Sequence, residues 1–372
     1  MSSDQSKQAK AFYPALDLLR FTAAALVMLN HLRVNQFDSF SKVTCESGVL
    51  KTIFFSFTRV GLEAVVVFFV LSGFLVGGVS LARSRQGKFQ IGRYALDRFT
   101  RIYVPFVPAL VATIAIYLWF GLAVDWGEVL INLLSLQGVL GPPFSANTSL
   151  WSLSYEVWFY VAGGAILVLL YPASGRRFVA AILVLASVYV FANLSAAYLF
   201  VWLLGAAAYF ARYSSKVILC AAGAPAAVAG VVLMQLTSAS GEVDLASFKW
   251  MGRAAPLLLF GVGLGLLVAA ACQVRADSPA KRKVFRLGTW LAGFSYTLYL
   301  MHIPLIVIME QSGWLQRLSV LNSKTLAVFV TNALLILFFS WVFYLPFERN
   351  TDRIRKWLRG LLAARNSRLA QI

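Results

Sequence analysis

The sequence predicts an all-α protein: a polytopic membrane bundle of about ten transmembrane helices with both termini in the cytoplasm. Hydrophobic residues make up 60% of its 372 residues and charged residues only 13%, which is more apolar surface than a water-soluble domain can cover. Apolar runs of about 18–25 residues, long enough to cross a hydrocarbon core of about 30 Å, recur along the whole chain. Basic residues gather in alternate connections between these runs, as the positive-inside rule requires.

Each apolar run is expected to be a helix, because backbone polar groups in lipid must be satisfied within their own segment. One transmembrane domain is expected to fill 1–348, followed by a basic cytoplasmic tail over 349–372. The extended outer connections are predicted at 34–59 and 123–150. The predicted spans are 12–33, 60–82, 102–122, 151–171, 178–195, 197–212, 217–236, 254–273, 287–309 and 325–346.

The net charge of +18 is explained by topology rather than by a nucleic-acid partner. Residues 123–150 contain no Lys or Arg, so this stretch is predicted outside. The first apolar run contains an arginine and has no convincing processing site, so it is expected to stay as a membrane helix. The three cysteines offer neither a disulfide framework nor a metal-ligand spacing, and no metal is expected. The basic residues predicted inside are Lys7, Lys10, Arg83, Arg85, Lys88, Arg93, Arg98, Arg101, Arg176, Arg177, Arg212, Lys216, Arg275, Lys281, Arg282, Lys283, Arg286 and the tail from Arg349 to Arg368.

The first run, FYPALDLLRFTAAALVMLNHL, carries Arg20 and His31. Eleven residues are close to three helical turns, so both side chains leave one face, about 16 Å apart along the axis. A charge at mid-membrane costs at least about 2.5 kcal/mol, so Arg20 should face a polar interior. A plainer interpretation stays open, in which Arg20 pairs with Asp17 and His31 reaches the headgroups.

Three further titratable residues are predicted at the depth of His31. Glu63 and Glu156 lie early in spans that enter from outside, and His302 lies past the middle of a span that leaves. Each alone has a structural explanation: the carboxylates can be interfacial, and His302, beside Pro304, can bond a carbonyl freed at a kink. Together they predict a catalytic site with His31 as general base, oriented by Glu63 or Glu156.

The stretch RYALDRFTRIYVPFVP places an arginine cluster at the inner entrance of the third span. Arg98 and Arg101, spaced i, i+3 at the expected helix N-terminus, can bind phosphates through forked donors aided by the helix dipole. Pro105 and Pro108 are expected to bend or open the start of this helix. The basic residues just before the cluster are predicted as plain positive-inside anchors: Arg83, Arg85 and Lys88.

Five motifs in chain order resemble the acyltransferase 3 family of membrane acyltransferases, in its stand-alone form. They are LDLLRFTAAALVMLNH with Arg20 and His31, FFVLSGFL, RFTRIYVP, WSLSYEVWFY and SYTLYLMHIPL. The chain departs from the family at Glu63, where an aspartate is commoner, and at Val157 and Trp158, where a second acid and a glutamine are frequent. These departures weaken any role for a carboxylate pair after Glu156.

The resemblance implies an acyl-CoA-dependent O-acyltransferase of a bacterial inner membrane, with acetyl-CoA as the expected donor. Its expected acceptor is a hydroxyl of a glycan, as in polysaccharide modification, or of another small molecule. Arg93, Arg98 and Arg101 would hold the coenzyme phosphates and Arg20 would line its path.

Three alternatives stay open beside this expectation. His31 could act as base for direct transfer or could carry the acyl group itself. Ser72 could be a nucleophile, although a Ser beside Gly more often allows close helix packing. A transporter or flippase of a glycan or lipid-linked precursor would also explain buried charges.

The candidate acceptor-binding residues are Trp151, Ser154, Tyr155, Tyr299 and His302.

Overall fold

A computed structural model describes residues 13–171, 177–237 and 254–369 of the chain. In this part of the chain every regular element is a helix, and only isolated bridges pair extended residues. Lys7, Lys10 and Arg176 lie outside the described residues. The elements are α1 (Pro14–Gln36), α2 (Gly48–Thr58), α3 (Gly61–Ser72), the π-helical turn η1 (Gly73–Gly78), α4 (Val79–Arg85), α5 (Ile91–Trp119), α6 (Trp126–Leu133), the 3-10 helix η2 (Ser145–Leu150), α7 (Trp151–Leu170), α8 (Arg177–Asn193), α9 (Ala196–Ala211), α10 (Lys216–Thr237), α11 (Ala254–Ala271), α12 (Pro279–Ala292), α13 (Ser295–Gln311), α14 (Ser323–Tyr344), η4 (Glu348–Asn350) and α15 (Thr351–Leu369).

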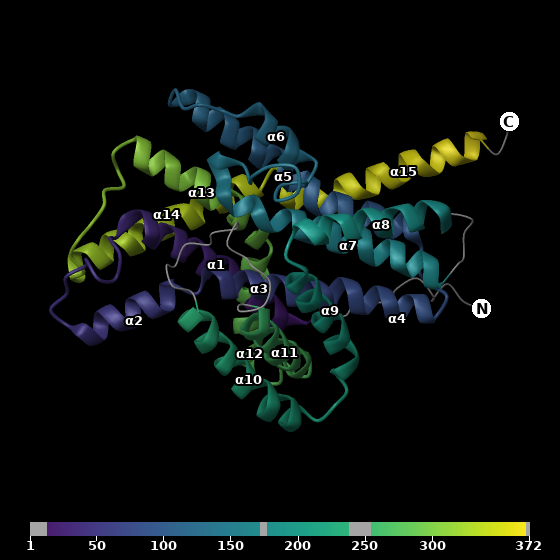
Figure 1. Ribbon diagram of the computed structural model, residues 1–372, viewed down its shortest axis with the longest axis horizontal. Coiled ribbons are helices and arrows are strands. Elements are labelled where there is room, and N and C mark those ends of the chain that lie inside the picture. Colours follow the sequence, from purple (N-terminus) through teal and green to yellow (C-terminus); the bar gives the residue numbers. More distant parts are fainter. Residues whose placement is uncertain (1–12, 172–176, 238–253, 370–372) are drawn as a thin grey trace.

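The polytopic helix bundle is confirmed, and each of the ten predicted spans falls on helix. Seven helical segments of the described chain are long and apolar enough to cross a membrane, and the bent pair α12 and α13 makes an eighth candidate. The other two predicted spans are the shorter apolar helices α8 and α9. Helix α1 packs against α3, α12, α13 and α14 near the middle of the bundle (Figure 1).

The two ends of the bundle are distinguished by their polar residues. The arginine end is the end where α1 and α5 begin, near Arg20 and Arg98. The histidine end is the end toward which α1 runs, near His31.

The predicted span 287–309 is broken into two helices bent by 54°. Helix α12 ends at Ala292, and the N–H of the next residue, Gly293, bonds back to the Thr289 carbonyl. Helix α12 carries four basic residues and runs along α1, where Gly288 fits against Leu18 and Thr289 bonds Asp17. Because that charged surface cannot enter hydrocarbon, only α13 turns into the bundle.

Helix α5 begins at Ile91, about three turns before the predicted start of the third span. Arg98 and Arg101 therefore lie in its second and third turns, and the expected help from the helix N-terminus does not apply to them. Pro105 and Pro108 are accommodated inside one continuous helix.

The FFVLSGFL motif forms a close helix crossing. A Cβ on Gly73 would collide with the Trp202 carbonyl of α9, and one on Gly205 with the Val70 carbonyl of α3. Such backbone contact is the reason for small residues where membrane helices cross. Ser72, beside Gly73, accepts a hydrogen bond from Trp202 Nε1 and donates to the Tyr160 hydroxyl. These contacts support the packing interpretation of Ser72.

The predicted outer connection 123–150 packs part of its residues into the bundle and leaves the rest exposed. Asn132, Ser135, Gln137 and Asn147 are all at most 1% exposed.

Pro304 has no N–H, so it frees the Leu300 carbonyl four residues earlier. Asn147 Nδ2 donates to that carbonyl at 2.8 Å. The segment 123–150 thus supplies a hydrogen bond to the carbonyl that Pro304 leaves without its helical partner, and it holds α13 in place. The sequence analysis had considered His302 for bonding such a carbonyl.

The basic tail folds into a helix, α15, which leaves the body of the bundle (Figure 1). Its first turns contact α5, where Arg355 Nε donates to Thr100 Oγ1 at 3.0 Å and is 3.6 Å from Asp97. The tail is therefore joined to the arginine end through α5.

Candidate active site

His31 and His302, the chain's two histidines, are in direct contact at the histidine end. His302 Nε2 lies 3.0 Å from His31 Nδ1, and the ring centroids are 5.0 Å apart. His302 is fully buried and His31 is partly exposed. His31 is therefore the less buried of the two imidazoles.

The hydrogen bonds fix the tautomers of both rings. His302 Nδ1 lies 3.2 Å from the Leu298 carbonyl, and because a carbonyl only accepts, this nitrogen carries the proton. Nε2 of a neutral His302 is then an acceptor, so His31 must donate from Nδ1. The remaining nitrogen, Nε2 of His31, keeps a free lone pair, and no hydrogen bond to it is present among the described residues. That is the arrangement a general base requires.

A second hydrogen-bonded group beside the pair fixes α13. The Tyr299 ring centroid lies 5.8 Å from that of His302. The Tyr299 hydroxyl donates to the Ser149 carbonyl at 2.6 Å and shares a 2.6 Å hydrogen bond with Ser152. Of the candidate acceptor residues, His302 thus contacts His31 directly and Tyr299 packs against His302.

The two predicted carboxylate partners of His31 contact other groups. Glu63 is buried and accepts a hydrogen bond from Gln235 on α10. Glu156 accepts from the Tyr160 hydroxyl at 2.6 Å. The Tyr160 ring in turn lies beneath Arg98, which places Glu156 toward the arginine end. In the structure the residue that contacts the His31 ring is His302, which the sequence analysis assigned to the acceptor.

The other predicted acceptor residues, all on α7, are held in an aromatic cluster with α3 and α9. The Trp151 and Tyr155 rings pack against Phe69 and Tyr198. The Tyr155 hydroxyl accepts from the Ser195 N–H at 2.9 Å. Ser154 is fully buried and donates to the Trp151 carbonyl. Their observed contacts are with one another and with neighbouring helices rather than with the histidine pair.

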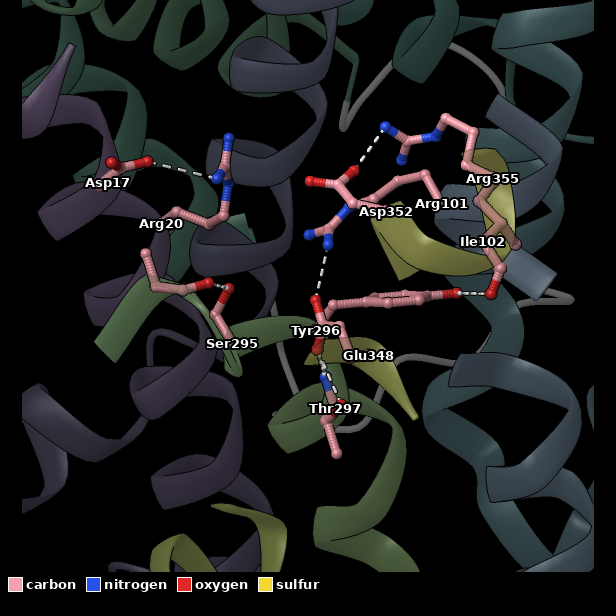
Figure 2. Close-up of polar contacts among 11 residues, drawn as sticks. Asp17, Arg20, Arg101, Ile102, Ser295, Tyr296, Thr297, Glu348, Asp352 and Arg355 are labelled. Atoms are coloured by element: carbon pink, nitrogen blue, oxygen red, sulfur yellow. Dashed lines mark hydrogen bonds and ion pairs between the residues drawn. The ribbon is translucent and has the colours of Figure 1, made fainter. Parts of the chain in front are cut away.

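Arg20 and Arg101 form a second group, about three turns from His31 along α1. Figure 2 shows each guanidinium held by a carboxylate. Arg20 is 3.4 Å from Asp17, and Arg101 is 2.6 Å from Glu348. Each of these two cations is therefore already paired with an acid in the structure.

Glu348, which the sequence analysis did not single out, joins α5 to α13. Its other oxygen accepts from the Thr297 N–H at 2.9 Å and from the Thr297 hydroxyl at 2.7 Å. The carboxylate therefore caps the first turn of α13 while it holds Arg101. The sequence feature that could have pointed to Glu348 is its position as an acidic residue between the last apolar run and the basic tail.

A cavity of about 390 Å³ opens between α4 and α5 at the arginine end. Arg93 and Arg98 line it, whereas Arg101 faces Glu348 instead. Arg98 lies over the Tyr160 ring, 5.5 Å from its centroid. Its Nε is buried without a hydrogen-bond partner among the described residues. An unsatisfied buried donor of this kind marks the place for an acceptor oxygen of a ligand.

Arg83 and Lys88, predicted as plain anchors, also line the cavity. The turn that brings them there depends on Gly87, which has a φ of +66° that residues other than glycine adopt at a cost. Lys88 N–H closes the turn on the Arg83 carbonyl at 2.9 Å. The cavity thus has four cationic side chains, and its size is that of a small-molecule site.

These features define the class of the protein as an integral membrane helix bundle. It has an oriented imidazole toward one end and a cationic cavity at the other. A family model described as an acyltransferase domain matches residues 13–345. The chain belongs to the acyltransferase 3 family.

A curated relative supports this assignment. The protein described as Acyltransferase MdmB, from Streptomyces mycarofaciens, is 33% identical over 159 residues, which are 40% of this chain and 37% of the relative. The match therefore spans little more than a third of that relative's length. No solved structure matches this chain.

Proposed function

We propose that this protein is a membrane O-acyltransferase that moves an acyl group, acetyl in the first instance, from acyl-CoA to a hydroxyl of a glycan or another hydroxylated acceptor. The observation that carries the proposal is the free lone pair on His31 Nε2, oriented by His302. Membership of an acyltransferase family favours this enzyme over a transporter or flippase.

The donor enters at the arginine end in this proposal. The cavity between α4 and α5 holds the phosphates through Arg93, Arg98, Arg83 and Lys88, since guanidinium groups bind phosphate through paired donors. The pantetheine arm then runs between the helices past Arg20 and Arg101 toward His31. The positive charge of these connections favours a cytoplasmic position for the arginine end, in a bacterial inner membrane.

The chemistry takes place at the histidine pair. His31 Nε2 removes the proton from the acceptor hydroxyl while the oxygen attacks the thioester carbonyl. As the carbon–sulfur bond breaks, the same nitrogen returns the proton to the leaving thiolate, giving free CoA and the ester. His302 accepts the Nδ1–H bond throughout and stabilises the imidazolium that forms in between. Attack by His31 itself on the thioester is the rival route, and it would give an acyl-histidine.

The donor assignment is tested by binding of labelled acetyl-CoA to the purified protein in detergent. Replacing Arg93 and Arg98 together with glutamine should raise the dissociation constant about tenfold or more, because two charge-assisted contacts with phosphate are lost. Replacing Arg282, an exposed arginine of α12, with glutamine is the matched control and should change it less than twofold. An unchanged constant in the double variant would reject the cavity as the donor site.

A further inference from the structure

We propose that the C-terminal helix α15 is a working part of the donor site, because its arginines neutralise Asp97 in the wall of the cationic cavity. Asp97 is the acidic residue among the described residues that line this cavity. The inference rests on the proposed binding of phosphates there and adds residues that lie more than 250 positions further along the chain.

The contacts between α15 and Asp97 are direct. Arg359 donates to the Asp97 carboxylate, and Arg355 Nε lies 3.6 Å from the same oxygen. Arg355 is further fixed by Thr100 and by Asp352. The Asp97 side chain is only 20% exposed, so water screens these charges less than it would on an open surface.

The charge balance gives this contact a consequence for ligand binding. Asp97 is adjacent in sequence to Arg98, whose buried Nε has no hydrogen-bond acceptor among the described residues. A bare carboxylate in this wall would repel phosphate and would also compete with it for the Arg98 guanidinium. Arg359 forms an ion pair with Asp97 and so neutralises its negative charge. The Arg98 guanidinium then remains free to bind a phosphate of the donor. Arg359 is therefore a positioning residue for donor binding, and it acts through Asp97.

Helix α15 has a reason to stay at this position. The exposed side chains of Trp357 and Leu361 lie one turn apart, on the side of α15 that is turned away from Arg355 and Arg359. A basic amphipathic helix next to a membrane bundle is suited to the bilayer surface. The helix can rest there while Arg355 and Arg359 reach α5.

The experiment measures binding of adenosine 3′,5′-bisphosphate to the full-length protein in detergent, at low and at high salt. Arg359→Gln should raise the dissociation constant about three- to tenfold at low salt, and 0.5 M salt should reduce this difference. Asp97→Asn should bind at least as tightly as the wild type. The double variant Asp97→Asn with Arg359→Gln should return to within about twofold of the wild type, since no bare carboxylate remains. Arg353→Gln, on another face of the same helix, is the matched control and should bind like the wild type.

The outcomes separate this inference from the proposed function. If the wild type binds the probe, Arg93→Gln weakens it and Arg359→Gln has no effect, the role of α15 is rejected and the donor site stands. If Arg359→Gln weakens binding but Asp97→Asn does not restore it, a charge effect through Asp97 is rejected. If the wild type does not bind the probe, the donor site and the inference both fail.

Discussion

Replacing His31 with alanine should reduce acyl transfer about a thousandfold or more and leave donor affinity within about twofold of the wild type. The substitution removes the nitrogen that we propose as general base, and general base catalysis typically contributes about 10²- to 10⁴-fold. The arginine end, about 16 Å away along α1 at 1.5 Å per residue, should bind the donor as before. Release of free CoA thiol in the presence of an acceptor, together with equilibrium binding of labelled acetyl-CoA, measures the two effects separately.

Two substitutions of His302 act as controls on the mechanism. His302→Phe removes the acceptor for His31 Nδ1–H and should lower kcat about 10- to 100-fold, with little change in the KM for the donor. His302→Gln keeps an oxygen that can accept this bond and should lose less. Transfer that survives in His31→Ala, or a glutamine variant less active than the phenylalanine variant, would contradict the assigned roles.

Replacing Glu348 with alanine should destabilise the fold by about 2–4 kcal/mol and also weaken activity. The Glu348 side chain is 2% exposed and that of Arg101 is 35% exposed, so the loss leaves a partly buried guanidinium without its counter-ion. It also leaves the buried Thr297 N–H without its acceptor, which costs about 1–3 kcal/mol in itself. The thermal midpoint of the purified protein and the dissociation constant for acetyl-CoA measure the two consequences.

A conservative substitution distinguishes capping from charge at this position. Glu348→Gln keeps an oxygen for Thr297 but loses the ion pair with Arg101, so its thermal midpoint should fall between those of the wild type and Glu348→Ala. An alanine variant as stable as the wild type would show that this carboxylate does not tie α5 to α13.

The sequence predicted the helical membrane architecture because apolar length and charge asymmetry are local properties of the chain. It predicted the depth of His31 and His302 for the same reason, and the structure brings these two residues together. Which side chains meet within one layer depends on helix rotation, and so Glu63 was expected beside His31 although it faces Gln235 on α10.

Other features could not be predicted because they depend on long-range contacts. Asn147 bonds the carbonyl that Pro304 frees, and Glu348 meets Arg101 across nearly 250 residues. The start of α5 was misplaced because its first turns are too basic to be read as a membrane span. Only the fold shows that Arg83 and Lys88 turn into a cavity through Gly87.

The central claim is that a donor held at the arginine end is used by an imidazole at the histidine end of the same bundle. The most direct measurement uses sealed proteoliposomes in which the arginine end faces outward, with labelled acetyl-CoA outside and a hydroxylated acceptor enclosed in the lumen. We expect labelled acceptor to accumulate in the lumen while free CoA appears outside, and we expect neither in vesicles that contain His31→Ala. Label that appears only on acceptor supplied outside, on the same side as the donor, would contradict the claim.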